Sequence, residues 1–299
     1  ETGFSVNDKL DEDHAGRKRN LCIDRFNSEK IVFTEDNEDK DSQKEEYSVV
    51  TLENASPLNY IKESLLKEKG KIELHRFESK ILKNTRRIWV YKSCKGKEME
   101  NESNLAILMD GFEYLNTLNA KTVLDNLVSR NELSSTVCVF IDNKEDRYNE
   151  LTCNDKYSDF IVMELLPWIK ENYRVTDDPR KTMIGGFSLG GLSAAYTAFK
   201  HPDVFGNVLS QSGSFWWEDE WFIKRVEESP PTTLRVYLNV GVLEQYPYDT
   251  EPIMMESINK LRDTFLLKGN EVFYEVFLSG HDYLSWGETF GNGLLKLLG

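Results

Sequence analysis

A serine between two glycines is the part of this sequence that points most clearly to chemistry. Gly186-Phe187-Ser188-Leu189-Gly190 has the pattern G-x-S-x-G, after the β-like run Thr182-Met183-Ile184 and at the start of a small-residue helix expected over Leu189–Lys200. A strand, a sharp turn and a helix form a nucleophile elbow, where the strained serine needs nearly side-chain-free neighbours two positions away. We therefore predict that Ser188 is a nucleophile. The backbone N–H of Leu189, at the helix N-terminus, is expected to supply one donor of an oxyanion hole.

A general base for this serine must come later in the chain, because on this scaffold the order is serine, acid, histidine. The chain has four histidines, His14, His75, His201 and His281. His14 and His75 precede Ser188, and His201 lies in His201-Pro202-Asp203, where a turn or a helix cap is expected. His281 follows the last expected strand, after the flexible residue Gly280. We predict that His281 is the base.

The third member of such a triad is a carboxylate that orients the imidazole and stabilises its cation. The loop after the strand expected over Leu234–Val240 offers three carboxylates: Glu244, Asp249 and Glu251. Asp282 is adjacent to His281, so its side chain should diverge from the ring. Glu244 comes first after the strand and is predicted to be the acid, with Asp249 and Glu251 as open alternatives.

Short apolar runs alternate with amphipathic segments over most of the chain. The expected strands are Tyr47–Leu52, Ile72–Phe77, Arg87–Tyr91, Leu105–Met109, Thr136–Ile141, Thr182–Phe187, Asn207–Ser210, Leu234–Val240 and Glu271–Leu278. The expected helices are Thr122–Ser129, Tyr157–Asn172, Leu189–Lys200, Glu218–Glu228, Pro252–Leu267 and Thr289–Leu298. This alternation predicts an α/β-hydrolase fold, with a mostly parallel sheet, helices on both faces and antiparallel strands at the start.

The first part of the chain has a different amino-acid composition. Residues 1–45 are rich in charged residues and asparagine, with one brief apolar patch at Ile31-Val32-Phe33. We interpret them as an acidic, flexible lead-in or the remnant of a truncated N-terminal domain. Residues 1–3 resemble a vector or processing scar, and residues 46–299 are expected to form the catalytic domain.

Composition excludes several kinds of partner. The net charge of −14 over 299 residues argues against nucleic acids and anionic membranes, which select basic surfaces. No run of 18 apolar residues is present, so no membrane insertion is expected. A soluble protein is predicted. The location is left open between the cytoplasm and, because a signal peptide can be removed, a secreted or periplasmic one.

The cysteines show no metal or redox spacing. Cys22, Cys94, Cys138 and Cys153 lie far apart, without a C-x-x-C pair. Cys138 falls in an apolar run and is expected to be a buried thiol, while a Cys22–Cys94 disulfide is left open. Asn54 and Asn101 begin glycosylation sequons that matter only in a secretory pathway.

Several motifs besides the elbow occur in order from about Tyr47 to the C-terminus. They are Arg86-Arg87-Ile88-Trp89-Val90-Tyr91, Met109-Asp110-Gly111-Phe112, Ile141-Asp142-Asn143, Arg147-Tyr148-Asn149-Glu150-Leu151, Glu164-Leu165-Leu166-Pro167-Trp168, Gly206-Asn207-Val208-Leu209-Ser210-Gln211-Ser212-Gly213-Ser214-Phe215-Trp216-Trp217 and His281-Asp282-Tyr283-Leu284-Ser285-Trp286. With these motifs the chain resembles the enterochelin (enterobactin) esterases, which hydrolyse the cyclic trilactone of catecholate siderophores.

The resemblance implies further site residues. Arg147 would face a catecholate or the anionic iron complex, since a guanidinium suits paired oxygens; the alternative is a surface pair with Glu150. Trp216 and Trp217 would form an aromatic wall for catechol rings, or else pack as ordinary core. Gly111 or Phe112 would give the second oxyanion N–H.

The expected reaction is therefore acyl transfer from a siderophore lactone through a serine ester. No cofactor or metal is expected, and iron would arrive only as part of a ferric-siderophore substrate. One alternative is a general carboxylesterase, acting on feruloyl esters, S-formylglutathione or peptidyl esters. Another is a hydrolase-fold binding protein without catalysis. The sequence leaves the oligomeric state open.

Overall fold

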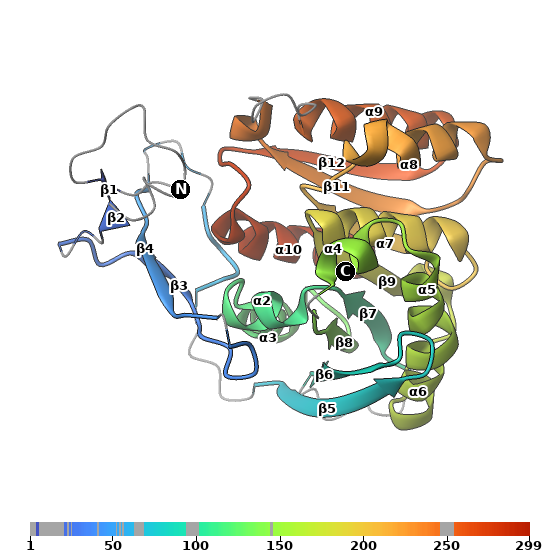
Figure 1. Ribbon diagram of the computed structural model, residues 1–299, viewed down its shortest axis with the longest axis horizontal. Coiled ribbons are helices and arrows are strands. Elements are labelled where there is room, and N and C mark those ends of the chain that lie inside the picture. Colours follow the sequence, from blue (N-terminus) through green and yellow to red (C-terminus); the bar gives the residue numbers. More distant parts are fainter. Residues whose placement is uncertain are drawn as a thin grey trace. The chain divides into compact units, whose positions relative to one another are not determined.

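The computed structural model describes residues 4–5, 21–22, 24, 26–40, 42–51, 53, 55, 57–62, 69–93, 102–143, 146–245 and 254–299. The chain divides into two compact units, Glu1–Ala55 and Ser56–Gly299 (Figure 1).

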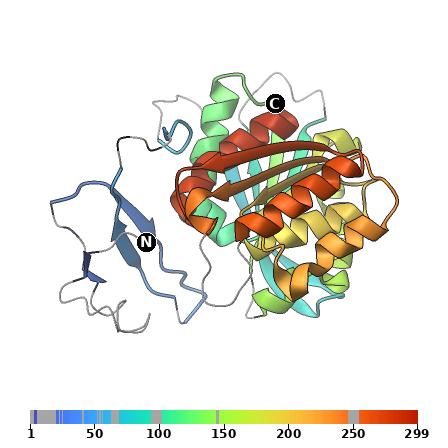
Figure 2. The same cartoon turned by 90° about the horizontal axis from the view of Figure 1, so that it is seen from above.

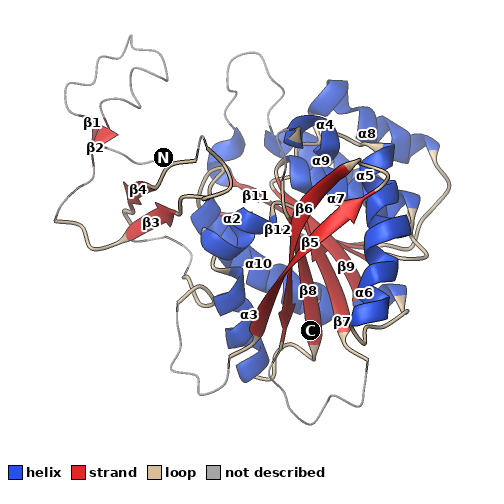
Figure 3. Ribbon diagram, turned by 60° about the horizontal axis from the view of Figure 1, so that its bottom comes forward, coloured by secondary structure: helices blue, strands red, loops and turns tan. Residues whose placement is uncertain are grey.

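The second unit is built on one eight-stranded sheet. Its strands are β5 (Lys71–Ser79), β6 (Asn84–Lys92), β7 (Asn104–Leu108), β8 (Thr136–Ile141), β9 (Thr182–Phe187), β10 (Asn207–Gln211), β11 (Arg235–Gly241) and β12 (Glu271–Phe277), in the order β12-β11-β10-β9-β7-β8-β6-β5. β6 runs antiparallel to both of its neighbours, and the other pairs are parallel (Figure 3). The predicted α/β-hydrolase fold is confirmed.

Helices cover both faces of this sheet (Figure 2). They are α2 (Gly111–Asn116), α3 (Ala120–Ser129), α4 (Arg147–Leu151), α5 (Asp155–Asp159), α6 (Leu166–Asn172), α7 (Leu189–Lys200), α8 (Trp217–Glu228), α9 (Met254–Leu267) and α10 (Tyr283–Leu298). A π-helical turn, Phe160–Leu165, joins α5 to α6. In the part of the chain that the structure describes, no helix combines the length and the apolarity needed to cross a membrane.

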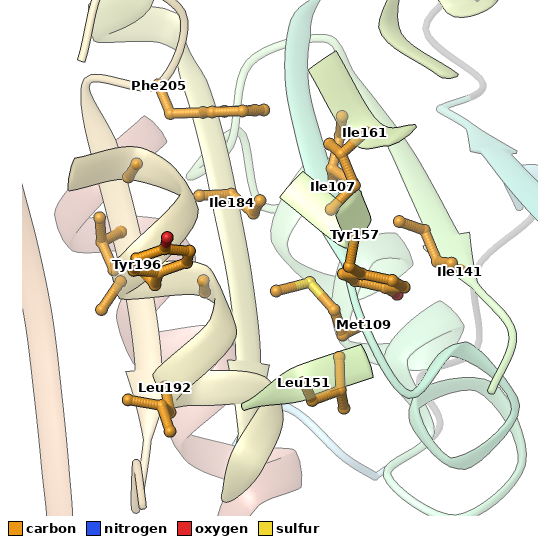
Figure 4. Packing of buried hydrophobic residues seen from close by; sticks show 14 of the residues in the cluster. Ile107, Met109, Ile141, Leu151, Tyr157, Ile161, Ile184, Leu192, Tyr196 and Phe205 are labelled. Atoms are coloured by element: carbon orange, nitrogen blue, oxygen red, sulfur yellow. The ribbon is translucent and has the colours of Figure 1, made fainter. Parts of the chain in front are cut away.

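Two apolar cores lie on the two faces. On one face, Ile107 of β7 and Ile184 of β9 belong to the same cluster as Leu192 and Tyr196 of α7 (Figure 4). The alternate positions of the strands pack with α2, α3 and α10 on the other face. The central strands β7, β8, β9 and β10 are buried along their whole length, which explains the mostly apolar sequences of β7, β8 and β9.

The first unit contains two short antiparallel pairs, β1 (Phe4–Ser5) with β2 (Leu21–Cys22) and β3 (Lys30–Phe33) with β4 (Glu45–Ser48). The expected strand Tyr47–Leu52 was assigned to the large sheet, and that assignment is wrong. Its first residues form β4, where Tyr47 lies opposite Ile31 and contacts the ring of Phe33 edge-on. A local hairpin closes a shorter loop than pairing with a distant strand would. The first compact unit extends to Ala55.

Candidate active site

The elbow expected around Ser188 is present in the structure. β9 ends at Phe187, α7 begins at Leu189, and Ser188 between them has φ 54° and ψ −122°. A non-glycine residue rarely adopts a positive φ, so this turn is held by its surroundings. A Cβ at Gly186 would lie 2.5 Å from the carbonyl carbon of Gly190, so the backbone at Gly190 approaches Gly186 too closely for any side chain there. The glycines are therefore required by the turn.

His281 and Glu244 meet at the carboxyl edge of the sheet. Glu244 lies in a 3₁₀ turn, Val242–Gln245, directly after β11, and His281 follows the end of β12. The distance between His281 Nδ1 and Glu244 Oε2 is 2.8 Å. The Glu244 carboxylate is almost fully buried, whereas the His281 side chain is 31% exposed. The acid is thus fixed in the interior while the imidazole reaches solvent.

Two further donors hold the Glu244 carboxylate. Its Oε1 accepts hydrogen bonds from the Ser212 hydroxyl, at 2.7 Å, and from the Gly241 backbone N–H, at 2.8 Å. Ser212 follows β10, the strand between the elbow strand and the acid strand. The carboxylate therefore has a donor on each oxygen and little freedom to rotate.

Trp286 of α10 joins this pair to the elbow. Its indole N–H donates to Ser212 Oγ at 3.0 Å. Its ring stacks on Phe187, with centroids 4.6 Å apart, and meets the His281 ring edge-on at 4.6 Å. The Trp286 ring therefore lies between the imidazole and Phe187, the residue that precedes the candidate nucleophile.

The Ser188 hydroxyl has a different partner. Its Oγ lies 3.3 Å from the Ser214 hydroxyl, and among the described residues it has no hydrogen bond to His281. Contacts between nucleophile and base are often loose in the absence of substrate. The structure places both groups at the same edge of the sheet, from β9 and from the segment after β12.

The other candidate acids differ in position. Asp249 and Glu251 lie outside the described residues. Asp282 caps α10 by accepting a 2.9 Å hydrogen bond from the Ser285 N–H, and it also contacts the Ser279 hydroxyl. This cap starts α10 at Tyr283, six residues before the expected start at Thr289.

The loop expected to give the second oxyanion donor packs against the elbow. Asp110 takes a left-handed conformation with φ 55° at the start of α2, so Gly111 and Phe112 open the helix. The first N–H groups of a helix have no partner within it. A Cβ at Gly190 would lie 2.8 Å from Asp110 Oδ2, which shows how closely the two segments approach. The roles of Leu189, Gly111 and Phe112 in an oxyanion hole stay predictions.

Arg147 points to Asp110. Its Nε and Nη2 donate to the two Asp110 oxygens at 2.6 and 2.8 Å. The alternative of a surface pair with Glu150 is wrong. Glu150 is buried and accepts two hydrogen bonds from the buried Arg86, at 2.6 and 3.1 Å, so it is already occupied.

Trp216 and Trp217 are both half-buried, and Trp217 packs in part against the apolar core. The Trp217 indole N–H donates to the Tyr148 hydroxyl at 3.2 Å, which brings α8 next to α4. Tyr148 is 55% exposed and follows Arg147 directly. These rings offer an aromatic surface where α8 meets α4, the helix that begins at Arg147.

A second acid lies beside the oxyanion loop. Burial, together with the Asp110 carboxylate, raises the pKa of Glu113 to about 7. Asn143 reaches both carboxylates, at 2.5 Å from Asp110 Oδ1 and 3.5 Å from Glu113 Oε2. Burial and the same two acids also raise the pKa of Tyr283.

The sequence did not single out several residues of this site, namely Asp110, Glu113, Tyr148, Ser212, Ser214 and Trp286. All of them except Glu113 stand in the motifs quoted for the family resemblance, but no role was assigned to them, and Ser212 and Ser214 also come soon after β10, beside the elbow strand. Within the described residues, no group of three or more His, Cys, Asp or Glu side chains could hold a metal ion.

The remaining cysteine and asparagine predictions have mixed outcomes. Cys138 is buried and free, as expected, and Cys153 is also free. Burial raises the pKa of both thiols, and for Cys153 the Asp155 carboxylate adds to this effect. Cys94, Asn54, Asn101 and the side chain of Cys22 lie outside the described residues.

A strand order with one antiparallel strand, an elbow serine and a histidine hydrogen-bonded to a buried carboxylate define a hydrolase of the α/β class. Residues 79–297 match the model of the Esterase family, and the chain belongs to this family. The resemblance to enterochelin esterases is confirmed at the level of the family.

Among its relatives is the iron(III) enterobactin esterase of Escherichia coli O6:H1, which is 31% identical over 74% of this chain and 56% of the relative. The iron(III) salmochelin esterase of the same organism is 29% identical over 65% of this chain and 50% of the relative. The chain thus spans about half the length of these curated relatives.

The chain is also similar to solved structures of enterobactin esterases. The ferric enterobactin esterase of Salmonella typhimurium superposes with a TM-score of 0.78 at 26% identity, over 95% of this chain and 70% of that chain. The enterobactin esterase of Shigella flexneri, crystallised in the presence of enterobactin, has a TM-score of 0.77 at 26% identity and the same coverage.

Proposed function

We propose that this chain is a serine esterase that hydrolyses the lactone bonds of a catecholate siderophore such as enterobactin or its ferric complex. The observation that carries the proposal is the hydrogen bond between the buried Glu244 and the partly exposed His281, at the edge where the Ser188 elbow lies. The substrate class rests on the relatives, which are enterobactin and salmochelin esterases by name.

In the proposed reaction, Ser188 Oγ attacks a lactone carbonyl while His281 Nε2 accepts its proton. The Glu244 carboxylate fixes His281 with Nδ1 protonated and stabilises the imidazolium. The Leu189 N–H and an N–H of Gly111 or Phe112 bind the oxyanion. His281 then protonates the departing alkoxide, which leaves a serine ester of the opened chain.

The second half of the reaction repeats this geometry with water. His281 takes a proton from a water molecule, which attacks the ester carbonyl, and the proton returns to Ser188 Oγ as the acid leaves. The net change is one ester and one water to one acid and one alcohol. Iron takes no part in these steps and is present only when the substrate carries it.

The half-buried rings of Trp216 and Trp217, with the exposed ring of Tyr148, support binding of flat aromatic groups such as catechols. Arg147 at the same place is proposed to contribute a positive edge to a chain whose net charge is −14. A local cation is needed there, because a ferric catecholate complex is an anion.

The test is chromatography with mass detection on enterobactin, with and without iron, using the wild type, Ser188→Ala and the control Ser193→Ala. We expect linear trimer, dimer or monomer from the wild type and the control, and none from Ser188→Ala. Hydrolysis of simple aryl esters without any action on the trilactone would leave a general carboxylesterase. Inertness towards both would favour a binding protein without catalysis.

A further inference from the structure

Asp110 is a buried carboxylate at an unfavourable place for the proposed chemistry. Its side chain is fully buried, directly before Gly111 and Phe112, and it faces Gly190 at the start of α7. The proposed oxyanion develops between these two helix starts. A negative side chain there opposes the negative charge that the transition state must form.

The expected size of this opposition is large. Two like charges about 6 Å apart, in a site with an effective dielectric constant of about 20, slow a reaction by roughly 100-fold. A buried carboxylate of this kind needs a nearby positive charge if the oxyanion hole is to work.

Arg147 is placed to cancel this charge. It binds both Asp110 oxygens, and its charge is held in place by that pairing. The neighbouring carboxylates use other cations: Asp142 pairs with Arg87 at 2.7 Å, and Glu150 pairs with Arg86 at 2.6 Å. Among the described residues, Arg147 is the only cation that forms an ion pair with Asp110.

The raised pKa of Glu113 indicates an excess of negative charge around Asp110. The Asp110 carboxylate and burial together raise its pKa to about 7 even with Arg147 nearby. Loss of the Arg147 charge would leave Asp110 and Glu113 without compensation. The amide of Asn143 can orient these carboxylates but carries no charge.

We propose that Arg147 is the counter-ion of Asp110. Its positive charge cancels the Asp110 charge that would otherwise repel the oxyanion of the transition state, whatever ester is bound. Arg147 is then a positioning residue that acts on the rate through Asp110. This inference rests on the proposed function only in requiring a Ser188 esterase. It differs from substrate recognition, in which Arg147 would matter only for an anionic or catecholate ligand.

The test uses a neutral ester, 4-nitrophenyl acetate, which offers no group for Arg147 to recognise. We expect Arg147→Gln to lower kcat by about 100-fold with KM within about twofold of the wild type. Arg147→Lys keeps the charge and should stay within about tenfold of the wild type. The surface change Arg130→Gln is the control for loss of an arginine, and thermal melting checks that each variant folds.

The double variant separates charge from structure. Asparagine has nearly the shape of aspartate and tolerates the left-handed conformation that residue 110 adopts. Once Asp110 is neutral, Arg147→Gln in the Asp110→Asn background should change kcat by less than about threefold. This comparison works even if Arg147→Gln alone fails to fold.

Two results would overturn the inference. One is an unchanged kcat on the neutral ester for Arg147→Gln, with a raised KM on enterobactin alone, which would leave Arg147 with substrate contact as its sole role. The other is a further 100-fold loss in the Asp110→Asn background. Failure of the proposed function shows up separately, as a wild type that hydrolyses 4-nitrophenyl acetate through Ser188 and leaves enterobactin intact.

Discussion

Replacing Glu244 by glutamine tests the candidate triad directly, because the structure fixes how the amide must lie. Glu244 Oε1 accepts from the Gly241 N–H and from the Ser212 hydroxyl, and that hydroxyl is itself fixed by the Trp286 N–H. The amide NH₂ cannot occupy this position, because it would set a donor against the Gly241 donor. The glutamine oxygen must stay there, so the NH₂ faces His281.

The consequence is the wrong tautomer of the imidazole. With an amide N–H pointing at Nδ1, that nitrogen must accept, and the ring proton moves to Nε2. Nε2 then cannot take the proton of Ser188. The corresponding Asp→Asn change in the best-studied serine protease triad lowers kcat about 10⁴-fold. We expect a loss of 10³- to 10⁴-fold here, or about 4 to 5.5 kcal/mol of transition-state stabilisation.

The assay is kcat on 4-nitrophenyl butyrate, together with the rate of labelling by a fluorophosphonate. Asp282→Asn is the matched control, since asparagine preserves the cap on Ser285 and the residue is adjacent to His281. The control should keep near wild-type activity. A Glu244→Gln enzyme within fivefold of wild type would refute the reasoning and direct attention to Asp249 or Glu251.

Three further predictions concern stability. Ser188→Gly should abolish activity and raise stability by about 1 kcal/mol, because glycine adopts the elbow conformation without strain; a lower melting temperature in calorimetry would contradict this. Gly186→Ala should cost about 3 kcal/mol in urea unfolding, since its Cβ meets backbone 2.5 Å away, whereas Gly280→Ala, with a nearest contact of 3.7 Å, should cost little. Glu113 has a pKa raised from about 4.5 to about 7, so the folded state favours its protonated form and loses up to about 3 kcal/mol as pH rises through this range. Glu113→Gln should remove that loss between pH 4.5 and 8, and parallel pH profiles for the two proteins would argue against it.

The elements predicted best from the sequence are those whose two ends are both marked by neighbouring residues. β8, β9 and α7 have the expected bounds, because buried strands and a glycine-bordered helix mark their own ends. Helices that begin through a side-chain cap or an unusual backbone angle were missed or shortened. α2 starts after the left-handed Asp110, and α10 starts at the Asp282 cap, neither of which a hydrophobic pattern reveals.

The site was predictable in part for a related reason. Residues after parallel strands gather at one edge of the sheet, so Ser188, Glu244 and His281 could be assigned to that edge from the sequence. The direction of Arg147 could not, because it depends on Arg86 occupying Glu150 from a distant strand. The contact of Ser212 with Glu244 depends on the strand order, which is a property of the whole fold.

That strand order explains why the candidate acid and base, Glu244 and His281, are held more firmly than the candidate nucleophile Ser188. β10 lies between the strand that ends at the elbow and the strand that ends at the acid, so the residue after β10 can contact both sides. Ser212 uses this position to bind Glu244 and Trp286, and Trp286 packs on His281. Ser188 instead contacts Ser214 through a longer hydrogen bond, and the His281 imidazole is partly exposed. A bound ester that displaces water from this edge strengthens the electrostatic attraction between serine, imidazole and carboxylate, so we infer that substrate completes the triad on a scaffold whose acid–base half is already assembled.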